Sequence, residues 1–422
     1  MKLGKSHNPT PSRGRIVWFA AGTAAIVLIL FVYHLLTWRS FTGIIRAVVR
    51  CEELFCDFVI YYYPMGEAIF RTGLPVQGFL YSPFIAIMLA VFPPLGPNAS
   101  LVLWGILQVL FVFLYFLLFR RLVPAGLPIQ LLFIAIALSS FSILLNFMGG
   151  QVSVFMIVAL LGTLLLYERG RRATAAGLLT LAVSFKFYPI IFLAPFAARR
   201  DTRFLLFAAA ACGTLLFVVP VFLLGVSDTL SFYGAIFNSF RESDWVVANP
   251  HSHYFPHVVL RLTSTMGHDA QASLPLLRWI AYGIAAANMG LIFLVQRARL
   301  RNANLWSFQL VFLTLPFLLK TSWPHDFVFL PFTQALLVWR LLEKKKRGVT
   351  FFLLLTSVVL SNIIFFNLFG DFFRYSFYAL LFWSDLLLLM ALYLELLPPA
   401  LLRIRESQAD GVGLKFPTGK GK

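Results

Sequence analysis

The chain has 422 residues, of which 60% are hydrophobic and only 12% are charged, and its mean hydropathy is +0.83. Soluble domains carry about a quarter charged residues, so these charges are too few to cover a water-facing surface and a soluble globular protein is excluded. The net charge of +18 does not require a nucleic-acid partner, because basic residues gathered in the cytoplasmic turns of a membrane protein give the same excess.

Apolar runs long enough to cross a bilayer as helices recur along the whole chain. The first run is too long for a cleaved signal peptide, and no small-residue cleavage site follows it. We therefore expect an all-α polytopic membrane protein with about 10 to 12 membrane helices. The clear runs are residues 16–36, 101–119, 127–147, 152–167, 204–224, 276–295, 305–319, 327–342, 351–368 and 377–397.

The turns between these runs divide by charge. Basic clusters lie before the first run, at 120–121, 169–172, 199–200, 297–301 and 344–347, and in the tail. The positive-inside rule places these turns and both termini in the cytoplasm. The segments 39–79, 148–151, 227–273, 320–326 and 370–374 hold ten of the seventeen acidic residues, and we expect them to face outward.

The domain organisation follows from this pattern. We expect a cytoplasmic N-terminal segment (1–15), a single transmembrane domain (16–400) and a cytoplasmic, disordered tail (401–422). The outer loops 39–98 and 227–275 are too long to be plain connectors, and long loops on one side are where chemistry is usually placed.

Two segments break simple alternation. Residues 81–92 are too few to cross comfortably and end in Pro93-Pro94, which favours an interfacial or re-entrant helix on the outer side. Residues 173–197 have basic clusters at both ends and contain Pro189, which predicts a broken hairpin that enters from the cytoplasm and returns. At about 1.5 Å per residue, the first arm raises Lys186 roughly 20 Å into a hydrocarbon core about 30 Å thick.

Asp57 and Lys186 are the two candidates for chemistry. Asp57 lies in a run of aromatic residues that can exclude water and stack on a sugar, which favours a general base with a raised pKa; the alternative is a solvated acidic loop that includes Glu52 and Glu53. A lysine within an apolar run marks a functional site, and an anionic lipid phosphate would suit it. The alternative is a snorkelling Lys186 paired with a structural carboxylate.

Histidines suggest two further hypotheses. His325 in a short outer turn could donate to a phosphate oxygen or, oriented by Asp326, relay a proton. His251, His253 and His257 invite a metal interpretation, but the prolines disturb helical placement and no acidic ligand lies inside the run. An aromatic, polar loop that contacts the acceptor or a headgroup explains this segment equally well.

The remaining features are smaller. Gly149-Gly150 allows a tight turn or the close approach of a ligand, and Gln151 could hydrogen-bond a hydroxyl. No Walker pattern or other nucleotide loop is present in the sequence. Cys51 and Cys56 could pair in an oxidising compartment, although positions five apart on a helix are poorly placed for a disulfide.

Taken in order, several motifs resemble glycosyltransferase family 87, polytopic mannosyltransferases of the glycosyltransferase-C superfamily. The motifs are the aromatic Asp57 segment, Tyr81-Ser82-Pro83 before Pro93-Pro94, "GQVSVFMIVALLG", "AAGLLTLAVSFKFYP" and the His325 turn. Tyr81-Ser82-Pro83 stands where the family usually has paired prolines. The resemblance implies a glycosyltransferase-C-like helical bundle with outer juxtamembrane helices.

The resemblance also implies a reaction: a hexose, typically mannose, passes from a polyprenyl-phosphate carrier to a glycolipid or glycan acceptor with inversion. Asp57 would be the general base, Lys186 would hold the donor phosphate with His325 assisting, and Gln151, Tyr61, Tyr62 and Tyr81 would contact the sugar or acceptor. No cofactor is expected, although some relatives in the superfamily use a divalent ion. The enzyme would be a monomer in a bacterial-type plasma (inner) membrane, with its site facing the periplasm or exterior.

Two rival functions remain open. A transporter or flippase of a lipid-linked sugar would also need intramembrane cations, but such proteins often show matching broken segments in two halves, and only one broken hairpin is evident here. A lipid-linked glycan ligase or polymerase with another donor would also suit the long outer loops, but would depend more on outer arginines and a catalytic histidine than on one aspartate.

Overall fold

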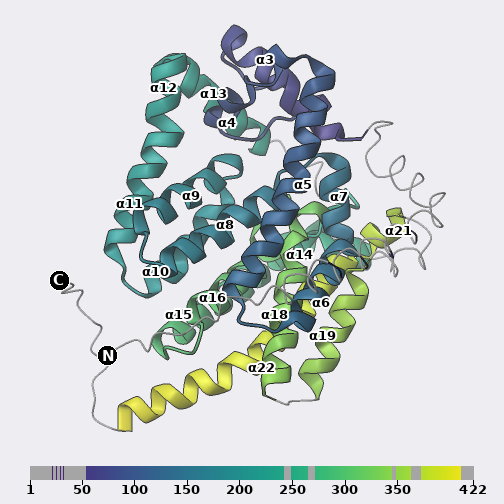
Figure 1. The fold of residues 1–422 in the computed structure, drawn as a ribbon, viewed down its shortest axis with the longest axis vertical. Coiled ribbons are helices and arrows are strands. Elements are labelled where there is room, and N and C mark those ends of the chain that lie inside the picture. The colour runs from purple at the N-terminus through teal and green to yellow at the C-terminus, as the bar shows by residue number, and fades with distance from the viewer. Residues whose placement is uncertain are drawn as a thin grey trace.

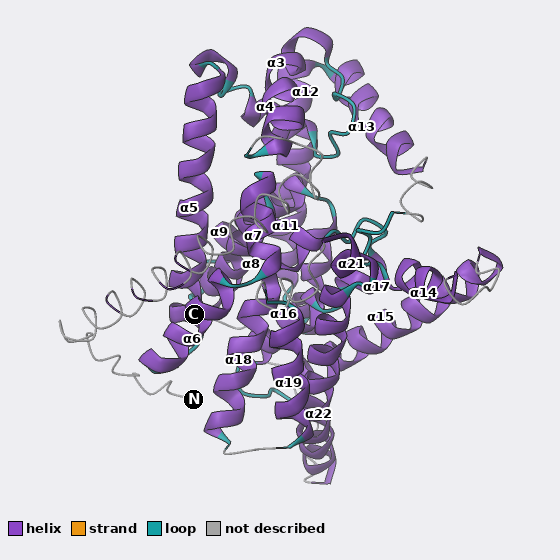
Figure 2. Cartoon of the chain, turned by 90° about the vertical axis from the view of Figure 1, so that its right-hand side faces the viewer, coloured by secondary structure: helices purple, strands orange, loops and turns teal. Residues whose placement is uncertain are grey.

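The computed structural model describes residues 54–241, 249–264, 271–344, 348–362 and 372–409, together with Ala21, Ala25, Ile29 and Val32. This part of the chain is all helical and contains no strand, as Figure 2 shows. The expected all-α class is therefore confirmed. Cys51, Glu52, Glu53, most of the first predicted span and the end of the tail lie outside the described residues.

Figure 1 shows how the helices are arranged. In chain order they are η1 Phe58–Tyr62, α3 Tyr63–Thr72, α4 Pro83–Leu89, η2 Pro93–Leu95, α5 Pro97–Leu122, α6 Leu127–Leu138, α7 Phe141–Gly149, α8 Ser153–Glu168, α9 Arg172–Phe185, η3 Tyr188–Leu193, α10 Ala194–Ala198, α11 Thr202–Gly213, η4 Thr214–Val218, α12 Val219–Leu224, α13 Val226–Arg241, α14 Phe255–Ser264, η6 Gln271–Ser273, α15 Leu274–Arg297, α16 Ala303–Phe312, α17 Leu315–Leu318, η7 Pro324–Phe329, α18 Leu330–Glu343, α19 Val349–Leu360, α21 Phe372–Phe377 and α22 Leu380–Ala409.

Four helices in the described residues are long and apolar enough to cross a membrane: Pro97–Leu122, Thr202–Leu224, Leu274–Arg297 and Leu380–Ser407. The number becomes five if α7 and α8, which meet at a bend of 116°, form one broken span. The prediction of 10 to 12 membrane helices stays a prediction, because several apolar runs are divided into shorter helices.

The run 127–147 shows the reason for such a division. It was expected to be one continuous span, and this is wrong, because α6 ends at Leu138 and α7 begins at Phe141. The Ser139 hydroxyl donates to the Ala135 carbonyl at 2.7 Å, and the Phe141 amide donates to the Ser361 carbonyl at 3.0 Å. Hydrophobicity alone does not reveal a break whose backbone groups are satisfied by a distant segment.

The hairpin at 173–197 has the predicted break. α9 ends at Phe185, Lys186 adopts an extended backbone, and η3 follows with Pro189 in its first turn. Arg172 and Arg199, at the two ends, line the same cavity, so the segment returns to the end of the molecule from which it started.

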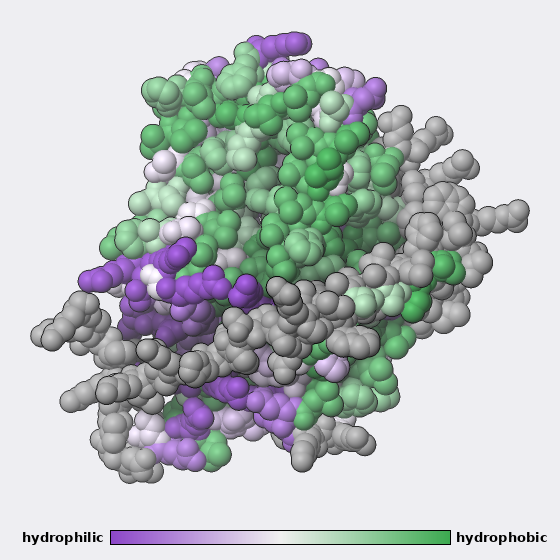
Figure 3. All heavy atoms as spheres, viewed as in Figure 1, coloured by the Kyte–Doolittle hydropathy of each residue, from purple (hydrophilic) through white to green (hydrophobic). Residues whose placement is uncertain are grey.

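In the described part of the chain, two large apolar cores and one small cluster around Leu260 and Leu277 hold the helices together. The larger core runs through α5 to α22, and the smaller core joins η1, α3 and α4 to α5, α8 and α9. Figure 3 shows hydrophobic side chains over most of the face between the α3 and α12 end and the α10 and α15 end, where hydrophilic side chains gather. Large exposed apolar side chains such as Phe222 (85%) and Trp279 (72%) are stable in lipid.

Candidate active site

The Asp57 segment docks onto the bend between α7 and α8. The Phe55 amide donates to the Met148 carbonyl at 2.8 Å, and the Phe58 ring stacks on Trp104 with centroids 4.8 Å apart. The Trp104 indole donates to the Gly150 carbonyl at 3.0 Å. These contacts fix the start of η1, and with it Asp57, beside the bend.

Glycine is required at the bend itself. Gly150 has a φ of +66°, and a Cβ atom there would lie 2.9 Å from the Phe55 Cβ. The bend is also tied by side chains, since Gln108 Nε2 donates to the Gln151 carbonyl at 2.8 Å and Asn146 Nδ2 donates to Gln108 Oε1 at 3.0 Å. The prediction that Gly149-Gly150 serves a tight turn is met at Gly150.

Asp57 is a half-buried carboxylate that makes no capping hydrogen bond to η1. Burial raises its pKa from 3.8 to about 7, and the nearby charge of Lys186 opposes that rise. A solvated loop does not describe this position. A carboxyl group with such a pKa is half ionised near neutral pH, the range that suits a general base.

Lys186 forms an ion pair that joins distant parts of the chain. Its Nζ atom lies 2.5 Å from Asp326 Oδ1. The same oxygen accepts from the Ser153 hydroxyl at 3.1 Å, and Asp326 Oδ2 accepts from the Trp323 amide at 3.2 Å. Burial alone would raise the pKa of Asp326, but the charges of Lys186 and His325 and the hydrogen bonds from Lys186 and the Trp323 amide hold it below its usual value.

The pairing of Lys186 with a carboxylate is the alternative that the sequence left open. The positive charge of Lys186 also lowers the pKa of Asp57, so the lysine acts on a second carboxyl group besides the one with which it forms the ion pair. Asp326 was considered only as a partner of His325 and was not predicted as a site residue. A lysine in an apolar run requires a partner, but ten acidic residues lie in the outer segments, and the sequence does not single out Asp326 among them.

His325 lies beside the Lys186–Asp326 ion pair but is not hydrogen-bonded to Asp326. Its Nε2 atom is 3.8 Å from Asp326 Oδ1, which exceeds hydrogen-bond distance. Burial lowers the pKa of His325 to about 4, against the attraction of Asp326. The imidazole is therefore neutral at pH 7 and can donate from one ring nitrogen.

Tyrosines form the other wall of the site. The Tyr62 and Tyr81 hydroxyls are hydrogen-bonded at 2.7 Å, and Tyr62 also donates to Gln151 Oε1 at 3.3 Å. Burial raises the pKa of both tyrosines, so they stay protonated. Burial and the charge of Asp57 raise the pKa of Tyr61. Tyr188, which the sequence did not single out, interacts electrostatically with both Asp326 and Tyr81.

The predicted site residues are thus brought together from five segments of the chain. Asp57, Tyr61 and Tyr62 come from η1, and Tyr81 precedes α4, which is tied to α9 by a 3.2 Å hydrogen bond from the Ser82 amide to the Ser184 carbonyl. The other contributions are Gln151 at the α7–α8 bend, Lys186 at the end of α9 and His325 in η7.

The histidine segment packs behind this site. His253 is buried, its ring lies 5.3 Å from that of Phe327, and its amide donates to the Ser322 carbonyl at 2.8 Å. His257 Nδ1 is hydrogen-bonded to the Ser252 hydroxyl at 2.8 Å. Among the described residues, no three His, Cys, Asp or Glu side chains come together as a metal site would require. Cys56, next to Asp57, is disulfide-bonded, and Cys212 is free.

The chain was compared with known proteins and families. The model of glycosyltransferase family 87 matches residues 79–322, which is more than half of the chain. Tyr81, Gln151 and Lys186 lie inside the matched range, whereas Asp57, Tyr61 and Tyr62 precede it and His325 follows it. No curated protein and no solved structure matches the chain significantly. On the extent of the family match, the chain belongs to glycosyltransferase family 87 and is a membrane glycosyltransferase.

Proposed function

We propose that this enzyme transfers a hexose, most simply mannose, from a polyprenyl-phosphate sugar to a hydroxyl group of a glycolipid or glycan. The observation that carries the proposal is a half-buried carboxyl group, Asp57, within the electrostatic influence of Lys186, whose Nζ atom Asp326 holds at 2.5 Å. A base and a cation in one aromatic-walled site match the two charges that develop when a hydroxyl attacks a glycosyl phosphate.

In the proposed step, the acceptor O–H gives its proton to Asp57 as its oxygen forms a bond to the anomeric carbon. The bond from that carbon to the phosphate oxygen breaks, and the phosphate keeps the electron pair. Attack from the face opposite the phosphate inverts the anomeric centre, so a β-linked donor gives an α-linked product.

Lys186 and His325 would bind the departing phosphate. An ammonium group has three N–H donors, and Asp326 accepts from one of them, which leaves two for phosphate oxygens. Asp326 is then a positioning residue that holds Lys186 at the break of the hairpin. Tyr61, Tyr62, Tyr81 and Gln151 would contact the sugar or the acceptor through hydroxyl and amide groups.

We further propose that this site faces the exterior of a bacterial-type plasma membrane, with both termini in the cytoplasm. The arginines that gather where α8 ends and α9 begins, at the end of the molecule away from this site, support that orientation. Glu67→Cys in α3 and Arg169→Cys after α8 replace exposed residues near the two ends. A membrane-impermeant maleimide should label the first from outside and the second only after permeabilisation; the reverse pattern would overturn the orientation.

The transfer reaction can be tested in membranes that carry the protein, a labelled polyprenyl-phosphate mannose and a lipid extract. Asp57→Ala should lower the rate by about 10²- to 10⁴-fold. Glu67→Ala, which removes an exposed carboxylate from α3, is the matched control and should not change it. Transfer at the wild-type rate by Asp57→Ala would rule out the assigned base.

The acceptor is best sought by mass analysis of glycolipids from cells with and without the protein. The proposal requires a lipid that is one hexose heavier only where active protein is present. An unchanged glycolipid profile, with wild-type protein verified in the membrane and donor supplied, would count against a glycolipid acceptor and direct the search to glycans.

A further inference from the structure

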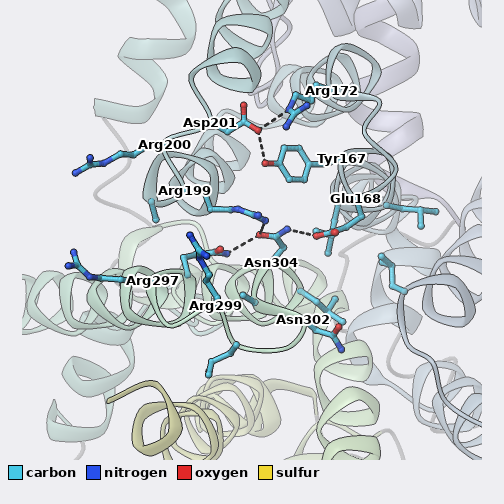
Figure 4. A pocket seen from close by; sticks show the side chains of 18 of the residues that line it. Tyr167, Glu168, Arg172, Arg199, Arg200, Asp201, Arg297, Arg299, Asn302 and Asn304 are labelled. Carbon is cyan, nitrogen blue, oxygen red and sulfur yellow. Dashed lines mark hydrogen bonds and ion pairs between the residues drawn. The ribbon is translucent and has the colours of Figure 1, made fainter. Parts of the chain in front are cut away.

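A cavity of about 820 Å³ lies at the other end of the hairpin from the transfer site. Helix α8 runs from Ser153, which contacts Asp326, to Glu168, which lines the cavity. Its 16 residues span about 24 Å, so the cavity is separate from the site described above. It forms where α5, α8, α10 and α15 end and α9, α11 and α16 begin, as Figure 4 shows from close by.

The cavity carries a large excess of positive charge. Two carboxylates line it, Glu168 and Asp201, against seven arginines: Arg121, Arg172, Arg199, Arg200, Arg203, Arg297 and Arg299. Both carboxylates already have partners within the wall. Asp201 Oδ2 accepts from the Tyr167 hydroxyl at 2.7 Å and from Arg172 at 2.9 Å, and Glu168 accepts from the Asn304 side chain. The concave surface therefore favours an anion.

The N-termini of two helices add to the positive electrostatic potential of the cavity. Helices α9 and α16 begin at the cavity, at Arg172 and Ala303, and neither start is capped by a side-chain hydrogen bond. The Arg172 and Ala303 amides donate to the Gly170 and Leu300 carbonyls, both at 3.0 Å, and the positive end of the helix dipole at each start favours negative charge. Arginine supplies the planar fork that binds phosphate oxygens in pairs.

Hydrogen bonds between side chains hold part of the cavity wall in place. Arg199 donates to Asn304 Oδ1 at 2.8 Å, and the same oxygen accepts from Gln296 at 3.1 Å, with Asn304 and Gln296 both buried. Arg200 and Arg299 adopt the left-handed backbone at φ of +57° and +49°. Glycine is the usual residue at such positions after a helix, so an arginine there keeps its side chain at the cavity at a conformational cost of about 1 kcal/mol.

An apolar surface adjoins the cavity. A second hollow shares Arg172 and Arg203 with it and continues to Leu206 and Phe207 on α11. These two side chains are 70% and 44% exposed, on a helix long and apolar enough to span the membrane. A soluble anion would gain nothing from this surface, whereas the acyl chains of a lipid would cover it.

We propose that this cavity binds the phosphate-bearing headgroup of an anionic phospholipid in the leaflet opposite the transfer site, with the acyl chains along Leu206 and Phe207. Scattered arginines at a cytoplasmic surface would only orient the protein. Here they surround a cavity with a polar wall, helix starts and an adjoining apolar track, and the bound headgroup would link α9, α11, α15 and α16.

The test uses the full chain in nanodiscs that contain equal amounts of phosphatidylglycerol and phosphatidylcholine, released into native mass spectrometry. Wild type should retain phosphatidylglycerol selectively. Arg199→Gln with Arg203→Gln should lower that retention by at least about tenfold, the loss of charge-assisted hydrogen bonds. The control pair, Arg169→Gln with Arg405→Gln, removes two exposed charges that do not line the cavity and should retain the lipid as wild type does.

Each other outcome overturns the proposal. Equal losses in both pairs would mean that net charge alone attracts the lipid, and no loss in either would mean that the cavity is not the site. Displacement of the lipid by millimolar inorganic phosphate would assign the cavity to a soluble anion. Arg199→Lys with Arg203→Lys keeps the charge and, with the apparent melting temperature, separates a binding defect from misfolding. No donor or acceptor is used, so the result is independent of the proposed transfer reaction.

Discussion

Replacing Asp57 with asparagine should abolish transfer and at the same time stabilise the protein at alkaline pH. Burial raises the pKa of this carboxyl group from 3.8 to about 7, a difference of about three units. At about 1.36 kcal/mol per unit, ionised Asp57 destabilises the folded state by about 4 kcal/mol. Asparagine keeps the shape of the side chain and removes that charge.

The effect depends on pH in a defined direction. Below about pH 4 the carboxyl group is protonated in both the folded and the unfolded chain, so wild type and variant should be equally stable. Between about pH 4 and 7 the unfolded chain releases the proton while the folded chain retains it, and the penalty grows. Above pH 7 the whole penalty is present, and Asp57→Asn should be more stable by up to about 4 kcal/mol.

Apparent melting temperatures in detergent at pH 4.5 and pH 8 would measure this difference. We expect the variant to melt several degrees higher at pH 8, and to keep only about a quarter of that gain at pH 4.5, where the unfolded chain has already begun to release the proton. Glu67→Gln, on the exposed surface of α3, should show no gain at either pH. The reasoning fails if Asp57→Asn is no more stable than wild type at pH 8, or if its gain is the same at both pH values. In wild type, the transfer rate at pH 6 should be about one tenth of its alkaline plateau.

Three further predictions concern Lys186, the metal requirement and the packing of α3. Lys186→Gln should raise the KM for the donor by at least about 30-fold. The double variant Lys186→Gln with Asp326→Asn should show the same high KM. A normal KM in the double variant would show that the single variant failed only because Asp326 was left unpaired. In the proposed mechanism Lys186 supplies the cation for the phosphate, so EDTA should leave the transfer rate unchanged. A loss of activity that Mg²⁺ or Mn²⁺ reverses would contradict this. Gly66→Ala should destabilise the protein by about 1–3 kcal/mol, because the new Cβ atom would lie 2.5 Å from the Leu89 backbone oxygen. The melting temperature should fall accordingly. The control, Gly234→Ala, has open space around the new Cβ atom and should leave the melting temperature unchanged.

The hairpin and Lys186 could be predicted because each departs from a simple apolar run. A charge in such a run and a proline in its second arm are visible in the sequence, and the structure places the break where Lys186 ends α9. Its partner could not be predicted in the same way. Asp326 is 140 residues away, and its approach depends on the packing of η7 against α7 and α8, which no local pattern encodes.

The boundaries of the apolar helices were less predictable for a related reason. The run 305–319 is divided at Thr314, between α16 and α17. The Thr314 hydroxyl donates to the Leu310 carbonyl at 2.7 Å, and Asn288 of α15 donates to the same carbonyl. A break inside hydrophobic sequence persists because polar side chains of a neighbouring helix satisfy its backbone groups. A hydropathy profile shows the apolar stretch, but it does not show which side chains of a neighbouring helix bond to its backbone.

The two aspartates of the site show why residue type alone does not assign a role. Both lie within the influence of Lys186, yet Asp326 accepts hydrogen bonds from Lys186, Ser153 and the Trp323 amide. Lys186, His325 and the Trp323 amide keep the pKa of Asp326 low despite burial, so it stays ionised and paired with the lysine. Asp57 makes no capping hydrogen bond, and its pKa rises to about 7. Two carboxyl groups near one cation are thereby separated into an anion and a group that can accept a proton at neutral pH, which is the difference that the proposed roles of Asp326 as positioning residue and Asp57 as base require.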